Sequence, residues 1–313
     1  MADVKSSLQI ISATRPGGSA VKRSTGDRVA DVAIMAVLVF VVFLMVFPFY
    51  NMLLISLAKY EHVAGGDLYL WPKSITFESY RLIFLDPALP RAFLVTFMVT
   101  AMGVTLSMFI TTMAGYSLSK KNLPFRNTIF FFVIVTMYFS GGLVPWYLVC
   151  RDLGFVDSIL VMVIPSALNT FYMILMKNYF LTIPESLEES ARMDGANDIR
   201  IMFQIVIPIA APIMATISLF YAVERWNEWW FAMLFIKDTA KIPLQLLLRR
   251  IVIEATIDLG SEMANQMRDS QIQHFGPSIQ MATVTVTTIP ILCVYPFLQK
   301  HFTKGIMLGA IKA

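Results

Sequence analysis

Long uncharged stretches alternate with short polar ones along the chain. Six intervals of 19 or more residues contain no Asp, Glu, Lys, Arg or His, and they lie between residues 31 and 59, 91 and 120, 126 and 151, 157 and 177, 200 and 224, and 274 and 300. A helix needs about 20 apolar residues to cross a bilayer. The pattern therefore predicts an all-α membrane protein with six transmembrane helices, at about 30–56, 92–118, 127–149, 158–177, 201–223 and 276–299.

Composition and the positions of basic residues add a topology to this pattern. The 313 residues are 57% hydrophobic and 15% charged, whereas soluble domains carry about 25% charged residues. Lys and Arg gather in the first 28 residues and in the loop after the second predicted span, and such residues favour the cytoplasm. We therefore expect cytoplasmic tails at 1–28 and 300–313, a cytoplasmic loop at 178–200, and external loops at 58–91 and 224–274.

The cytoplasmic loop contains a short polar segment that predicts a rigid projection. Pro184 suits the first turn of a helix, Glu185 and Glu188 lie near its positive end, and Gly195 suits a left-handed stop. Asn197 or Asp198 can cap a second helix that continues into the fifth predicted span. A force on the projection would therefore pass into a membrane helix.

The chain carries few groups that could do chemistry by themselves. It contains no Gly-x-x-x-x-Gly-Lys-Ser/Thr motif, so ATP-driven transport would need a partner ATPase. The predicted spans contain no interior charged residue, which argues against a proton-driven carrier. Scattered histidines show no nucleophile or metal constellation, and Cys150 and Cys293 indicate neither a disulfide nor a metal site. We expect no enzymatic activity and no metal in this chain.

Polar side chains within and beside the spans are candidates for a substrate pathway. Ser166, Asn169 and Thr170 are spaced i, i+3 and i+4, so a helix would place them on one face. Trp226 and Asn227 follow the fifth span. Hydroxyl and amide groups suit a polyhydroxy solute because they replace hydrogen bonds to water. The alternative is that they hold helices together, as Ser and Thr commonly do in membranes.

The polar segment also resembles a known signature. Glu189-Ser190-Ala191, followed by Gly195 and by Ile205-x-Ile207-Pro208, is similar to the Glu-Ala-Ala…Gly…Ile-x-Leu-Pro signature of permease subunits in ATP-binding-cassette (ABC) importers, with Ser190 and Ile207 as the two departures. The resemblance implies the type I ABC importer permease fold and a coupling helix that docks on the ATPase. The residues that it implies for coupling are Glu188, Glu189, Ser190, Ala191, Asp194, Gly195, Ala196 and Pro208.

Similarity to this family extends from about residue 27 to the C-terminus, and it resembles the branch that imports oligosaccharides. It implies a second, related permease, two ATPase subunits that bind ATP and Mg²⁺, an external solute-binding protein, and a place in the bacterial inner membrane. The implied substrate is alginate or a related poly- or oligosaccharide. Because the spans lack basic residues, an anionic chain would need compensation from the partner, from helix dipoles, or from Arg225, Arg249 or Arg250.

Two other classes of function compete with this interpretation. A stand-alone channel or secondary carrier for a small polar solute would also use six spans, but it would need no dedicated cytoplasmic projection. A membrane scaffold for a cytoplasmic enzyme would need no polar faces within its spans. The sequence favours the importer permease over both.

Overall fold

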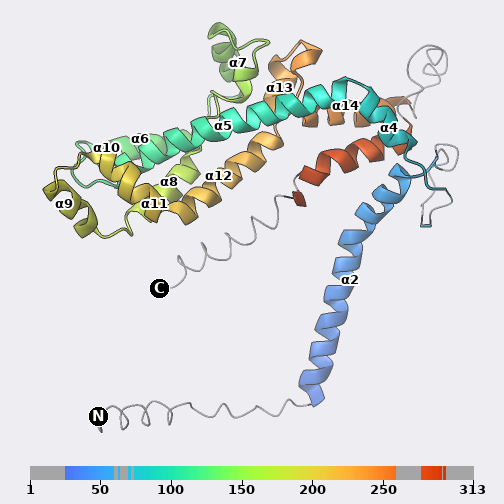
Figure 1. Cartoon of the computed structure of the whole chain (residues 1–313), viewed down its shortest axis with the longest axis horizontal. Helices are drawn as coiled ribbons and strands as arrows, with labels where there is room; N and C mark the ends of the chain where they lie inside the picture. Colours follow the sequence, from blue (N-terminus) through green and yellow to red (C-terminus); the bar gives the residue numbers. More distant parts are fainter. Residues whose placement is uncertain are drawn as a thin grey trace. The chain divides into compact units, whose positions relative to one another are not determined.

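The structure is a computed structural model that describes residues 25–59, 63, 70–71, 74–258, 276–290 and 292–293. Within these ranges it contains helices, turns and extended segments but no strand (Figure 1). The chain divides into two units, Met1–Asn51 and Met52–Ala313. The described part of the first unit belongs to α2, Thr25–Ser56, whose residues Val29–Ser56 are long and apolar enough to cross a bilayer.

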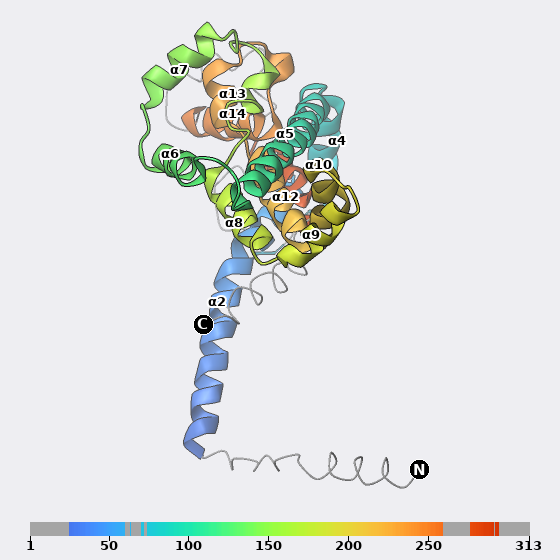
Figure 2. The ribbon, with the colours of Figure 1, turned by 90° about the vertical axis from the view of Figure 1, so that its left-hand side faces the viewer.

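The second unit is organised around α5, an unbroken helix of 32 residues, Ala88–Ser119, that contains the expected second span. Helices α8, Thr170–Phe180, and α12, Ala211–Trp226, pack along it, and both views show the three together (Figure 1, Figure 2). α5 accepts these neighbours because small buried side chains recur once per turn on one face, since small residues let membrane helices approach closely. They are Gly103, Ser107, Thr111 and Gly115.

Residues 127–149, expected as the third span, form parts of two helices. They are α6, Arg126–Tyr138, and α7, Leu143–Asp152, which are bent by 113° at the break between them. The connecting segment contains Gly142 at φ +88°, a backbone conformation that glycine adopts without steric cost. The third expected span is therefore a broken helix or a re-entrant pair and not a straight rod.

Residues 158–177, expected as the fourth span, are also interrupted. A short 3-10 helix, η1, covers Ile159–Met162, and α8 begins only at Thr170. Pro165 lies in the gap, where its missing N–H cannot continue a helix. Asn169 caps α8, because its Oδ1 accepts hydrogen bonds from the N–H groups of Phe171 at 3.0 Å and Tyr172 at 3.4 Å.

The fifth expected span, 201–223, begins and ends differently from the prediction. α10, Asp198–Ile201, continues through a π-helical turn, Met202–Val206, and α11, Ile207–Ile209, and the chain then bends by 85° into α12. α12 extends to Trp226, three residues beyond the expected end. Glu224 and Arg225 therefore belong to the helix and not to an external loop.

The remaining described elements are short or lie near the end of the chain. They are α4, Glu78–Leu85; α13, Trp230–Phe235; η3, Thr239–Lys241; α14, Leu244–Asp258; and helical residues 277–290. The sixth expected span, 276–299, is described only to residue 290 and at 292–293, where it is helical. The predicted tail 300–313 and residues 1–24 of the other tail lie outside the described residues. Within the described ranges, two helices can cross a bilayer, or up to four if each bent pair is one span.

Candidate functional site

The polar segment forms a short helix with well-defined ends, α9, Glu185–Met193. Pro184 stands at its N-cap, one position before the first turn where we expected it. At its other end the N–H of Gly195 donates to Arg192 O and that of Ala196 to Ala191 O, both at 3.0 Å. These two bonds form a Schellman motif. Gly195 has φ +82° and a Cβ there would meet nothing within 4 Å, so the position requires glycine for its backbone conformation alone.

The chain leaves α9 and enters the next helix through a capped turn. Asn197 Oδ1 accepts a hydrogen bond of 2.8 Å from Arg200 N, so Asn197, one of the two expected candidates, is the cap of α10. Arg192 and Asp198 form an ion pair at 2.8 Å across the turn. The bond and charge of Asp198 raise the pKa of Arg192 above its usual value. α9 is therefore tied directly to the helix that continues toward α12.

The inner face of α9 packs on the main core. Ala191 is buried in a cluster that also contains Tyr116 of α5, Phe180 of α8 and Tyr221 of α12. The cluster continues through the intervening helices, with the buried members Met108, Met176, Ile183, Ile201, Met202, Val206, Ala210 and Ile217. Ala191 of α9 and Tyr221 of α12 therefore belong to one continuous, buried cluster.

The outer face of α9 combines exposed charges with exposed apolar groups. Glu189, Ser190 and Asp194 are exposed, and so are Leu187 and Met193, the latter to 87%. Glu188 and Ala196 are half-buried, and Pro208, at the start of the bend into α12, is exposed.

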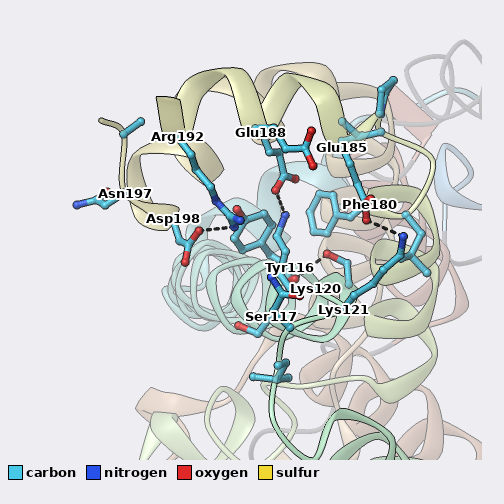
Figure 3. A pocket seen from close by; sticks show the side chains of 18 of the residues that line it. Tyr116, Ser117, Lys120, Lys121, Phe180, Glu185, Glu188, Arg192, Asn197 and Asp198 are labelled. Carbon is cyan, nitrogen blue, oxygen red and sulfur yellow. Dashed lines mark hydrogen bonds and ion pairs between the residues drawn. The ribbon is translucent and has the colours of Figure 1, made fainter. Parts of the chain in front are cut away.

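Two lysines at the end of α5 hold the first turn of α9 (Figure 3). Lys120 forms an ion pair with Glu188, and Lys121 forms one with Glu185 at 2.8 Å. Lys120 also lies over the ring of Tyr116, with its Nζ 4.0 Å from the centroid. The hydrogen bond and charge of Lys121 hold the pKa of Glu185 below its usual value. From the sequence we interpreted these lysines only as topology signals, because nothing in the order of residues brings 120 and 188 together.

An open pocket of about 1060 Å³ lies between α9 and the end of α5. Its lining includes both lysine–glutamate pairs and Asn197. Figure 3 shows Lys120 and Glu188 pointing toward one another in it, with Arg192 and Asp198 paired at its side. The ion pairs occupy the space between the two elements, so they brace α9 against α5.

Comparisons with known proteins agree with this geometry. The polygalacturonan/rhamnogalacturonan transport system permease protein YtcP of Bacillus subtilis is 42% identical over 288 residues, covering 91% of this chain and 99% of YtcP. The chain belongs to the permease subunits of ABC sugar importers. Protein LplC of the same organism is 38% identical over 85% of this chain and 89% of its own. No protein-family profile matches the chain.

Solved structures confirm the permease fold. A chain from the crystal structure of a bacterial ABC transporter involved in the import of the acidic polysaccharide alginate matches with a TM-score of 0.81 and 32% identity, covering 89% of this chain and 98% of that one. A chain from the alginate ABC transporter in complex with an alginate pentasaccharide-bound periplasmic protein matches at TM-score 0.53 and 14% identity, which supports the fold alone.

In this permease the expected pathway residues at 166–170 do not share one helical face, because only Thr170 belongs to α8. Ser166 accepts hydrogen bonds from Arg225 at both its hydroxyl and its carbonyl oxygen. Asn169 uses its side-chain oxygen as the cap of α8 and donates its backbone N–H to Tyr221 Oη at 3.0 Å. Ser166 and Asn169 therefore have structural partners within the permease.

The other expected pathway pair separates into a core residue and an exposed one. Trp226 is half-buried and packs edge-on against Phe93, with ring centroids 5.5 Å apart. Asn227 is exposed and donates from Nδ2 to Val223 O at 2.8 Å, which closes the end of α12. Asn227 therefore lies on an exposed surface of the permease, whereas Trp226 contributes to its packing.

Arg225, which we expected in the external loop 224–274, is buried on α12 with 4% of its surface exposed. It donates to Met162 O at 2.8 Å, to Ser166, and to Ser107 Oγ at 3.3 Å. A break in a membrane helix leaves carbonyl oxygens without partners, and side chains of neighbouring helices can satisfy them. Arg225 satisfies carbonyl oxygens at the gap between η1 and α8, so its charge faces the interior of the chain. Arg249 stacks on Trp229, with its Cζ 3.9 Å from the ring centroid.

Proposed function

We propose that this chain forms half of the translocation pathway of an ATP-driven oligosaccharide importer. In this proposal it has six transmembrane helices with both termini in the cytoplasm of a bacterial cell, and it lies in the inner membrane. A second, related permease supplies the other half of the pathway. Two ATPase subunits bind ATP and Mg²⁺, and an external solute-binding protein delivers the sugar. The chain itself hydrolyses nothing.

The observation that carries the proposal is that α9 has an exposed polar face and a buried face packed in the core. Its outer face presents Glu189, Asp194 and the exposed side chain of Met193, while Ala191 on its inner face is packed in the cluster that reaches α12. A docking surface fixed to a membrane helix can transmit the closure of an ATPase, whereas a channel or carrier has no use for one. We assign coupling to residues 188–191, 194–196 and Pro208.

For the substrate we propose alginate or a related acidic poly- or oligosaccharide. The support comes from two relatives, a polygalacturonan/rhamnogalacturonan transport permease and a chain of a transporter involved in alginate import. Polygalacturonan, like alginate, is a chain of uronic acids. Compensation of its charge falls to the partner permease, to helix dipoles, or to Arg249 or Arg250, since Arg225 is occupied by carbonyl and hydroxyl oxygens of its own chain.

The test is gentle purification of the tagged chain from its native membrane. We expect a second permease and an ATPase to copurify, and ATP hydrolysis to rise when a loaded solute-binding protein is added. Oligouronates of alginate and of polygalacturonan, each loaded on the binding protein, would identify the substrate. A chain that purifies alone, and with no associated ATPase activity, would favour the stand-alone channel or carrier.

A further inference from the structure

Glu224 and Arg225 are neighbours on α12, but the Glu224 side chain is exposed whereas that of Arg225 is buried. Glu224 is exposed and its Oε1 accepts a hydrogen bond of 2.6 Å from the hydroxyl of Tyr172 on α8. The Tyr172 ring is itself held by aromatic neighbours, with centroids 5.0 Å from Tyr221 in an edge-on contact and 5.5 Å from Phe220. The carboxylate is therefore fixed in position and not a mobile surface group.

The contacts of α12 with α5 give the depth of this carboxylate. Tyr221 hydrogen-bonds Thr111 at 2.7 Å, and the side chain of Arg225 packs on Gly103. Counting from Ser119 at the α9 end of α5, Thr111 is 8 residues away and Gly103 is 16. At 1.5 Å per residue these levels lie about 12 and about 24 Å along the helix. α5 itself has 32 residues and is about 48 Å long, so a hydrocarbon layer about 30 Å thick that is centred on α5 has its middle at the level of Gly103. Glu224 is the neighbour of Arg225 in sequence and therefore lies near this middle.

A carboxylate at this depth cannot face lipid without a large cost, so it marks a water-filled or substrate-contacting surface. Its neighbours on the same side of α12 are Phe220 and Asn227, at i−4 and i+3. The surface thus combines a fixed acceptor, an amide and two aromatic rings from α8 and α12. Aromatic faces beside a charged acceptor suit a sugar ring, whose C–H side is apolar and whose hydroxyls donate hydrogen bonds.

We propose that Glu224, held by Tyr172, is a sugar-hydroxyl-binding subsite of the translocation pathway. The inference rests on the proposed function, and it names the groups that would contact the sugar near the middle of the membrane. Because the subsite is negative and Arg225 is directed away from it, sugar hydroxyls and not sugar carboxylates contact this level. At this level the hydroxyl edge of the sugar chain therefore faces Glu224 and Tyr172, and the carboxylate edge of a uronate faces away from them.

The test uses the reconstituted importer with trigalacturonate and its neutral methyl ester, two probes that share every hydroxyl. Glu224→Gln keeps the size of the side chain and removes its charge, and Tyr172→Phe removes the donor but keeps the ring. We expect Glu224→Gln to lower the ratio of methyl-ester uptake to acid uptake about tenfold, since like charges at a binding surface suppress the wrong partner. Tyr172→Phe should change the ratio in the same direction by a smaller factor.

Glu78→Gln is the matched control, because it removes an exposed carboxylate that lies on α4, away from the α8 and α12 surface. It should leave the ratio unchanged. An unchanged ratio in both Glu224→Gln and Tyr172→Phe would overturn the subsite. Loss of the second permease from the purified Glu224→Gln complex would also overturn it and assign Glu224 to the subunit interface. Absence of ATP-dependent uptake by the wild type would instead overturn the proposed function.

Discussion

Lys120 at the end of α5 forms an ion pair with Glu188 in the first turn of α9. The side chains are 23% and 14% exposed, whereas those of the neighbouring pair, Lys121 and Glu185, are 68% and 66% exposed. An exposed pair contributes about 0 to 1 kcal/mol, but a partly buried charge left without its partner costs more. The two pairs therefore differ in how firmly they hold α9.

The first prediction concerns this brace. Lys120→Glu places two acidic groups against each other and should lower ATP-coupled uptake about tenfold, because α9 is no longer held against α5. The double variant Lys120→Glu with Glu188→Lys should recover most of the uptake. Lys121→Ala, the control, should stay within about twofold of the wild type. Equal loss in Lys120→Glu and Lys121→Ala would show that the buried pair has no special role.

The second prediction concerns the end of α9. Gly195→Ala places a side chain at φ +82°, where an L-residue loses about 1 to 2 kcal/mol. Gly195→Asp adds a charge at the docking surface, so it should uncouple ATP hydrolysis from uptake while the complex still assembles. Gly195→Asn should be the mildest of the three, because Asn tolerates the left-handed region. Uptake per ATP is the measurement, and a normal value in Gly195→Asp would remove this turn from the coupling path.

The third prediction concerns the approach of α5 to α12. A Cβ at Gly103 would lie 2.9 Å from both Cδ and Nε of Arg225, so Gly103→Ala must displace a side chain whose Nη1 and Nη2 groups are held by hydrogen bonds. We expect the midpoint of thermal unfolding to fall, with a loss of about 1 to 3 kcal/mol. Thr105→Ala, on the exposed side of α5, is the control and should be close to neutral. Equal midpoints of thermal unfolding for the two variants would argue against tight packing between α5 and α12 at Gly103.

The fourth prediction concerns Tyr221, whose side chain is fully buried. Its hydroxyl accepts from Asn169 N at 3.0 Å and shares a hydrogen bond of 2.7 Å with Thr111. Tyr221→Phe leaves both groups without this partner and should cost about 1 to 3 kcal/mol. The detergent-solubilised complex should melt earlier than its Tyr138→Phe counterpart, since Tyr138 is 77% exposed. No difference between the two would contradict a structural role for the break before α8.

The sequence predicted the features that depend on neighbouring residues. The second expected span coincides with the unbroken helix α5, and the stop at Gly195 and the cap at Asn197 are present because each is set by a few adjacent side chains. The resemblance carried by Glu189-Ser190-Ala191 and Pro208 led to the family that the relatives show.

Features that depend on distant residues were out of reach. A hydropathy window sums side chains and therefore cannot distinguish a broken span from a straight one, which is why the gap before α8 was missed. The partners of Arg225 lie about 60 and 118 positions away, at Ser166 and Ser107. Its burial follows from tertiary packing, so the sequence alone placed it in an external loop. The ion pair between Lys120 and Glu188 was missed for the same reason.

The most direct test of coupled transport is sugar uptake into vesicles that contain the complete, purified importer. Uptake and ATP hydrolysis are measured together, with the loaded binding protein outside and ATP inside. The account predicts uptake only when both are present, and a fixed number of sugars per ATP that falls in Gly195→Asp. Equal uptake without ATP, or by this chain alone, would contradict it and establish a channel or carrier instead.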